Sequence, residues 1–294
     1  RSDIDMAGGG QVVQEDTPIL SQNATPTSSS STCSSSVSRS LFVSVSLSVG
    51  LIIGAVVTSI PLTRSLRSSP VATRSTATSL SEANIVIKGI PKLSWLGYGQ
   101  VGAANVTADG ALLTMVAGKH TAMFVSPDGS SIPPDWSGSS GYVPASALVF
   151  EAPSSGVDWQ LSAKVTVPKF SYLFDSSCLF GYHGPYDWVN LCFEYSPEKV
   201  PEIVSVVTRG VSDDANGAVV EEGNSVYLRL SKFGDVMASH WSLDGKYWTL
   251  NRHFALQKPG EAMWIGFDVQ APTAESNTAI YSDIVFRKRT LLDL

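Results

Sequence analysis

One short run of the sequence carries residue types suited to sugar recognition. In WVNLCFEY, alternation places Trp188, Asn190 and Glu194 on one face of a β-strand, with Cys192 between the last two. An aromatic ring can stack on the C–H face of a sugar, and amide and carboxylate groups can pair with its hydroxyl groups. This face is therefore predicted to bind a ligand. The alternate residues are expected to point into a hydrophobic core: Val189, Leu191, Phe193 and Tyr195.

Two further runs place polar side chains on strand faces. SVYLRLS presents Tyr227 and Arg229, and VMASHWSL presents His240 and Ser242. If all these faces belong to the same sheet, they form a concave surface with an aromatic platform and one guanidinium donor, that of Arg229. The competing interpretation is an ordinary solvated face on which Arg229 pairs with Glu194 across strands. The predicted ligand-binding residues are Trp188, Asn190, Glu194, Tyr227, Arg229, His240 and Ser242.

An enzymatic site would require more than this face offers. Glycoside hydrolysis normally uses two carboxyl groups about 5–9.5 Å apart, and the sequence lacks the Glu-x-Asp-x-Glu motif of jelly-roll glucanases. Glu221 and Glu222 are expected in a polar loop, and Asp213 and Asp214 in a turn, so no catalytic residue is predicted. A polysaccharide lyase would need a base and a cation beside a uronate, for which the chain offers Tyr182, His183, Tyr186, Arg229 and His240.

Metal, cofactor and nucleic-acid sites have no support in the sequence. It contains no HxH, HExxH or CxxC pattern, and the acidic run DDANG is better explained by a hairpin turn than by a calcium loop. The formal net charge of -6, with no basic stripe, opposes binding to phosphate backbones. We therefore expect no metal, no cofactor and no nucleic-acid partner, which leaves a glycan or a protein as the ligand.

The elements that hold these residues are predicted to be β-strands of a domain spanning residues 83–294. Asp158–Val167 (DWQLSAKVTV) alternates strictly between apolar and polar residues, and Met263–Gln270 (MWIGFDVQ) repeats the pattern. Turn signals such as Gly184-Pro185 separate these runs, and helical periodicity is lacking. The fold class is therefore all-β, with about a dozen antiparallel strands in two packed sheets.

Two of the three cysteines flank one of these predicted turns. With the turn centred between Pro185 and Tyr186, Cys178 would face Phe193, which places the sulfur atoms of Cys178 and Cys192 on opposite faces unless a bulge intervenes. Two buried thiols are therefore expected. An odd number of cysteines leaves the redox compartment undecided.

The N-terminal part of the chain cannot build a comparable core. From Thr17 to Ser81 there is no Asp or Glu, and Ser and Thr dominate. We expect a disordered Ser/Thr-rich tail over residues 1–40 and a flexible linker over residues 63–82. Between them, residues 41–62 carry no charge and are long enough to cross ~30 Å of hydrocarbon as one helix. The chain is therefore predicted to be a single-pass membrane protein anchored through this segment.

Organelle targeting is the alternative, because the segment's surroundings are rich in Ser, poor in acids and carry Arg39, Arg64, Arg67 and Arg74. For a retained span, the excess of arginines after it favours a cytoplasmic C-terminal domain, and the opposite orientation stays open. Two glycosylation sequons, at Asn23 and Asn105, lie on opposite sides of the span, so only one can meet the glycosylation machinery.

Three segments together resemble a known family in order and spacing: HGPYDWVNLCFEY, PEIVSVVTRGVSDD and YLRLSKFGDVMASHWSLDGKYW. They resemble the regulation-of-enolase-like domain of unknown function, within the concanavalin A-like lectin/glucanase superfamily. The resemblance covers about residues 90–288, implies a jelly-roll sandwich and suggests carbohydrate binding. The chain departs from the family's pattern where Asn190 replaces a lysine and Asp214 replaces a tryptophan.

The resulting hypothesis is a concanavalin A-like jelly-roll β-sandwich, preceded by a disordered tail and one transmembrane or targeting helix. Its function is predicted to be non-catalytic binding at a polar and aromatic sheet face, with carbohydrate as the first expected ligand. The alternatives are a glycoside hydrolase or polysaccharide lyase of the same superfamily, and a protein-interaction domain with no sugar ligand.

Overall fold

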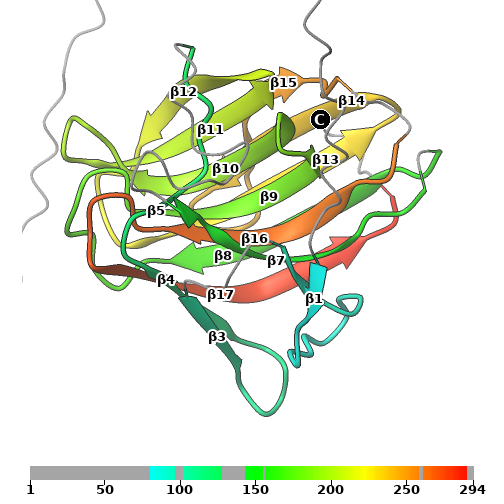
Figure 1. The fold of residues 1–294 in the computed structure, drawn as a ribbon, viewed down its shortest axis with the longest axis horizontal. Coiled ribbons are helices and arrows are strands. Elements are labelled where there is room, and N and C mark those ends of the chain that lie inside the picture. Colours follow the sequence, from blue (N-terminus) through cyan, green and yellow to red (C-terminus); the bar gives the residue numbers. More distant parts are fainter. Residues whose placement is uncertain (1–79, 97–101, 128–142, 155, 258–260, 290–294) are drawn as a thin grey trace, which may run out of the picture. The chain divides into compact units, whose positions relative to one another are not determined.

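A computed structural model describes residues 80–96, 102–127, 143–154, 156–257 and 261–289 (Figure 1). These residues belong to the unit Pro70–Leu294, the second of two compact units in the chain. All regular elements in them are strands, and they include no helix of the length and apolar character that a membrane crossing requires. The predicted tail over residues 1–40, the segment 41–62 and most of the linker lie outside the described residues.

Two antiparallel sheets form the domain, as the alternation predicted (Figure 1). In spatial order, sheet A comprises β1 (Leu80–Glu82), β2 (Ser94–Leu96), β7 (Ser146–Glu151), β16 (Trp264–Gln270), β9 (Ser176–Gly184), β10 (Asp187–Tyr195), β11 (Pro201–Arg209) and β12 (Val211–Val219). Sheet B comprises β15 (Thr249–Phe254), β14 (Val236–Ser242), β13 (Ser225–Phe233), β8 (Trp159–Thr166), β17 (Ser276–Arg287), β4 (Leu113–Gly118) and β3 (Gly102–Val106). A short parallel pair, β5 (Thr121–Ala122) and β6 (Val143–Pro144), stands apart from both.

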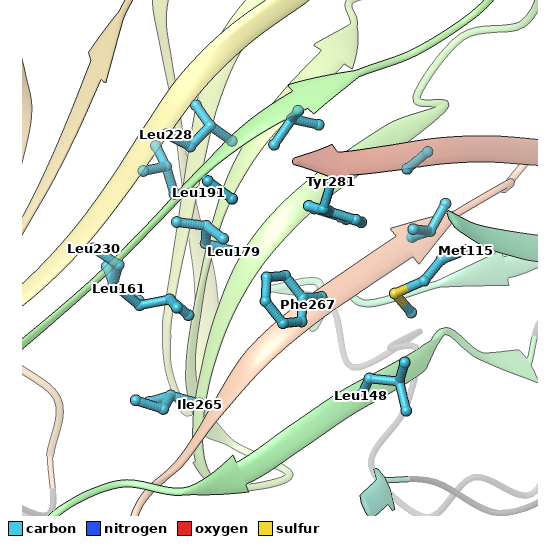
Figure 2. Packing of buried hydrophobic residues seen from close by; sticks show 14 of the residues in the cluster. Met115, Leu148, Leu161, Leu179, Leu191, Leu228, Leu230, Ile265, Phe267 and Tyr281 are labelled. Atoms are coloured by element: carbon cyan, nitrogen blue, oxygen red, sulfur yellow. The ribbon is translucent and has the colours of Figure 1, made fainter. Parts of the chain in front are cut away.

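The main core lies between the two sheets, where the apolar residue of each alternating pair points inward. Figure 2 shows Leu179 and Leu191 of sheet A among Leu161 and Leu228 of sheet B. Val189, Leu191 and Phe193 are fully buried in this core, as predicted, whereas Tyr195, which was also predicted to point into the core, is only half-buried. Burial of this apolar surface on both sheets is the main force that holds the sandwich together.

The outer face of sheet A is covered in part by a segment that crosses it, residues 121–126, which we call the strap. At one end, Ala271 N donates a hydrogen bond to Thr121 O (3.1 Å) at the end of β16. At the other end, on β12, Val125 N donates to Ser212 Oγ, and Ser212 N donates back to Val125 O, both at 2.8 Å. The strap thereby joins two distant strands of sheet A.

A second hydrophobic cluster lies between the strap and sheet A. It includes Met123 and Val125 of the strap, together with Phe180, Trp188 and Val206 of the sheet. Because these side chains are packed together, this part of the face is an additional core and not the open surface that the sequence predicted.

Cys178 and Cys192 also belong to this cluster, and they form a disulfide where two thiols were expected. A bulge beside Asp187 and Trp188 shifts the register of the hairpin by one residue, so that Cys178 lies directly opposite Cys192 with a Cα–Cα distance of 4.0 Å. The bulge brings both sulfur atoms to the same face of the sheet, because a shift of one residue reverses the alternation between faces.

Candidate functional site

The seven predicted ligand-binding residues fall on two different sheets. On β10 of sheet A lie Trp188, Asn190 and Glu194; on β13 and β14 of sheet B lie Tyr227, Arg229, His240 and Ser242. In each sheet these residues face away from the shared core, so the two groups are on opposite outer faces. The single concave surface that the sequence suggested does not form, and Arg229 cannot pair with Glu194.

Trp188 occupies the face that the alternation assigned to it, but it is 0% exposed. Its indole Nε1 donates a hydrogen bond to Pro185 O (3.1 Å), and its ring centroid lies 6.4 Å from that of Phe180. A ring enclosed in this way has no free surface on which a sugar could stack. Its position makes Trp188 part of the packing under the strap.

Asn190 is also fully buried and takes part in a polar network. Its Nδ2 donates to Asp268 Oδ2 (3.3 Å), which also accepts a bond from Gln270 Nε2 (2.7 Å). Gln270 Oε1 in turn accepts a bond from Met123 N of the strap (2.7 Å). Burial raises the pKa of Asp268 to about 7, while the two amide hydrogen bonds act in the opposite direction. The network therefore couples the strap to a buried carboxyl group that is about half protonated at neutral pH.

Glu194 is the one member of the predicted set that lines a substantial cavity. This cavity, which we call the outer-face pocket, has a volume of about 340 Å³ and lies on the outer face of sheet A. Its walls include part of the strap, one cysteine of the disulfide, polar side chains of three strands and one loop residue, among them Phe124, Cys192, Glu194, Gln270, Asp214 and Phe174.

Phe174 lies in the loop between β8 and β9 and is held in an unusual backbone conformation. Its φ is 67°, in the left-handed region that bulky residues rarely adopt. The loop is fixed by a hydrogen bond from Phe174 N to Tyr195 O (2.8 Å) and one from Tyr172 N to Asp175 Oδ2 (3.2 Å). The side chain remains 41% exposed. Such a conformation persists only where surrounding contacts impose it, and it often accompanies a functional site.

The two carboxyl groups of the pocket hold protons more tightly than usual. Burial raises the pKa of Glu194 to about 8, with further contributions from the charges of Asp214, Glu202 and Asp175. Partial burial and the nearby Asp213 also raise the pKa of Asp214, although Arg252 opposes the change. None of the described residues that line the pocket carries a positive charge. At neutral pH the pocket therefore offers a carboxyl O–H donor together with acceptors.

The four predicted residues on sheet B are brought together, but into a packed surface. Tyr227 lies opposite Ser242, and Arg229 lies opposite His240. Arg229 is 3% exposed, with its guanidinium 4.4 Å from the ring centroid of Trp248, and His240 is 2% exposed. These residues therefore have a structural role in the packing on sheet B.

Ser242 serves the hairpin that follows β14. Its Oγ donates to Asp244 Oδ1 (3.0 Å) and accepts a bond from Gly245 N (2.9 Å). Gly245 has a φ of 72°, as a turn of this kind requires. Ser242, Asp244 and Gly245 thus have a structural explanation in the turn itself.

Most residues that line the pocket are not in the predicted ligand-binding set, among them Phe124, Phe174, Asp214 and Gln270. Asp214 was expected in a turn, but it lies in β12 opposite Val206, because the polar run continues the antiparallel pairing with β11. Gln270 lay in a run that was predicted as a strand, although alternation cannot show which strand is its neighbour. Phe124 and Phe174 lie outside the regular strands, where no periodicity identifies them. Glu221 and Glu222 lie in a loop, as predicted.

The described residues contain no group of three or more His, Cys, Asp or Glu side chains that could hold a metal ion. What the site offers chemically is therefore a half-open apolar pocket with carboxyl and amide groups on its walls.

Comparison with known proteins agrees with this fold. Residues 104–289 match the family described as "Protein of unknown function (DUF1349)". That description does not carry the regulation-of-enolase name that the resemblance implied. No match is found among curated proteins.

Two solved structures are similar in fold. A functionally unknown protein from Saccharomyces cerevisiae is 17% identical, with a TM-score of 0.55, over 68% of this chain and 97% of the yeast chain. The Bacteroides ovatus protein described as Xyloglucan PUL GH43B is 10% identical, with a TM-score of 0.52, over 69% of this chain and 38% of its own. At these identities the similarity establishes a shared β-sandwich fold.

Proposed function

We propose, on the premise that the chain belongs to the family of proteins of unknown function DUF1349, that its sandwich domain binds carbohydrate in the outer-face pocket without catalysis. The observation that carries the proposal is the pocket itself, which joins an exposed aromatic ring to carboxyl and amide groups on one face of a jelly-roll sheet. The volume of about 340 Å³ lies within the range of small-ligand sites.

The chemistry of the walls suits a neutral sugar. Phe174 and Phe124 supply apolar surface for the C–H face of a ring, and Gln270, Glu194 and Asp214 supply partners for hydroxyl groups. An anionic uronate would find no cation to pair with among the described lining residues, so the pocket disfavours it. The expected ligand class is therefore an uncharged saccharide.

Replacing Phe174 by alanine is expected to weaken saccharide binding about tenfold or more, because the substitution removes the aromatic surface at the pocket. The full chain is screened against neutral and acidic glycans, including xyloglucan oligosaccharides because a structurally similar protein carries that name. Tyr247→Ala is the matched control: Tyr247 is an aromatic residue in the turn between β14 and β15 and is 83% exposed, so its loss should leave binding unchanged. Equal binding by wild type and Phe174→Ala, or no glycan binding at all, contradicts the proposal.

Hydrolysis is the second candidate, and one specific observation favours it. Glu194 and Asp214 line the same pocket, and a carboxyl group with a pKa of about 8 is suited to act as a general acid at neutral pH. The same glycans distinguish the two functions. Release of new reducing ends by wild type, lost in Glu194→Gln while glycan is still bound, would assign a hydrolase and reject the non-catalytic proposal.

We also propose that residues 41–62 anchor the chain as a single membrane span. The support is the uncharged length of this segment, which is sufficient to cross the hydrocarbon layer. After carbonate extraction of membranes, the full chain is expected in the pellet. Recovery of a shorter soluble species that lacks this segment would point instead to a processed targeting sequence.

A further inference from the structure

The disulfide bears on the compartment in which the domain resides. Cys178 and Cys192 are 0% and 1% exposed, and they are joined across β9 and β10 beneath the strap. Disulfides form and persist in oxidising compartments, whereas cytosolic thiols are normally kept reduced. A domain whose packed state contains this bond is therefore best suited to the lumen of the secretory pathway or to the cell surface.

A second and independent feature points to the same side of the membrane. The sequon Asn105-Val106-Thr107 begins on β3, which among the described strands pairs with β4 alone and forms one edge of sheet B. Ala104 and Val106 pack against the main core, whereas Asn105 and Thr107 are exposed. A glycan on Asn105 would thus extend into solvent without displacing any packed side chain.

A glycan on Asn105 would also protect the edge strand β3 from pairing with another chain. An edge strand presents unpaired backbone groups that can pair with another chain, and proteins commonly protect such edges. A bulky hydrated group on Asn105 would block the approach of a second strand to β3. The sequon therefore stands where the modification is both accessible and useful.

We propose that the sandwich domain is translocated across a membrane and N-glycosylated on Asn105, and that Cys178 and Cys192 are oxidised there by thiol–disulfide exchange with a disulfide donor, which is reduced to a dithiol. This reverses the orientation that Arg64, Arg67 and Arg74 favour. The inference does not depend on sugar binding in the outer-face pocket.

The test uses the full chain, synthesised in a eukaryotic system with microsomal membranes, and treatment with an enzyme that removes N-linked glycans. We expect a shift in mobility that corresponds to one glycan, lost in Asn105→Gln and retained in Asn23→Gln and in the sequon-preserving Thr107→Ser. If Asn105→Gln leaves the glycan content unchanged, the proposal is overturned.

Thiol labelling in denaturant gives a second readout that does not depend on the glycan. Without a reductant, Cys33 alone should react in the translocated chain, and all three cysteines should react after reduction. Labelling of Cys178 and Cys192 before reduction would overturn the assignment of an oxidised domain, even if the glycan were present.

Discussion

Replacing Trp188 by alanine is expected to lower the free energy of unfolding by about 3–5 kcal/mol, the range typical of a large aromatic residue removed from a core. The ring is fully buried in the cluster beneath the strap, and the substitution also removes the hydrogen bond from its Nε1 to Pro185 O. The expected loss is therefore one of stability, caused by a cavity and an unpaired carbonyl group. Denaturant unfolding of the variant measures it directly.

The control for this prediction is Tyr247→Ala, which truncates an aromatic side chain that is 83% exposed and should change stability by less than about 0.5 kcal/mol. If Trp188→Ala abolished glycan binding and left the free energy of unfolding unchanged, Trp188 would have to be accessible to a ligand. That result would contradict the packing described for the second cluster.

Trp188 also marks the limit of what alternation can predict. The period of two correctly placed Trp188 and Asn190 on one face of β10 and Leu191 on the other, because successive side chains in a strand point to opposite sides. Alternation does not indicate whether the outer face is open to solvent. The strap that covers it comes from residues 121–126, far away in sequence, and a run without periodicity gives no sign of where it will pack.

Strand order presents the same difficulty at longer range. Neighbours that are joined by a tight turn, such as β9 and β10, could be expected from the sequence. The insertion of β16 between β7 and β9 could not, because pairing over such sequence separation depends on the packing of the whole sandwich. It is this insertion that brings Gln270 and Asp268 beside the β10 face, so half of the polar network was beyond prediction.

A register shift of one residue determines whether Cys178 and Cys192 can form a disulfide. Alternation along a hairpin without a bulge places the two sulfur atoms on opposite faces, and the structure contains a bulge beside Trp188. Bulges depend on local twist and tertiary contacts more than on residue type, which is why the turn sequence alone could not settle the pairing.

Raising the pH from 5 to 9 is expected to lower the stability of the folded domain, as the largest effect of its buried carboxyl groups. In the folded state the pKa of Asp175 is about 6, that of Asp268 about 7 and that of Glu194 about 8, mainly because burial disfavours the charged form. Unfolding returns each group to water, where its pKa is near 4. Between the two values the folded state holds a proton that the unfolded state has released.

The sign of the effect follows from this difference. Stability from these groups is fully present below their unfolded pKa values and is lost progressively as the pH rises from about 4 through the folded pKa values of about 6 to 8. Each group that is protonated when folded and ionised when unfolded contributes a slope of about 1.4 kcal/mol per pH unit. Exposed acids with lowered pKa values, such as Asp109 and Asp244, act only at lower pH and in the opposite direction.

The variant Asp268→Asn isolates the deepest of these groups. The amide oxygen can still accept the bonds from Asn190 and Gln270, but the side chain no longer ionises, so the fall in stability from pH 5 to about 7 should become less steep. Glu222→Gln makes the same chemical change in an exposed loop and should leave the slope as in wild type. Urea unfolding at a series of pH values provides the measurement. A wild-type stability that is constant or rises from pH 5 to 9 would show that these carboxyl groups are not protonated in the folded domain.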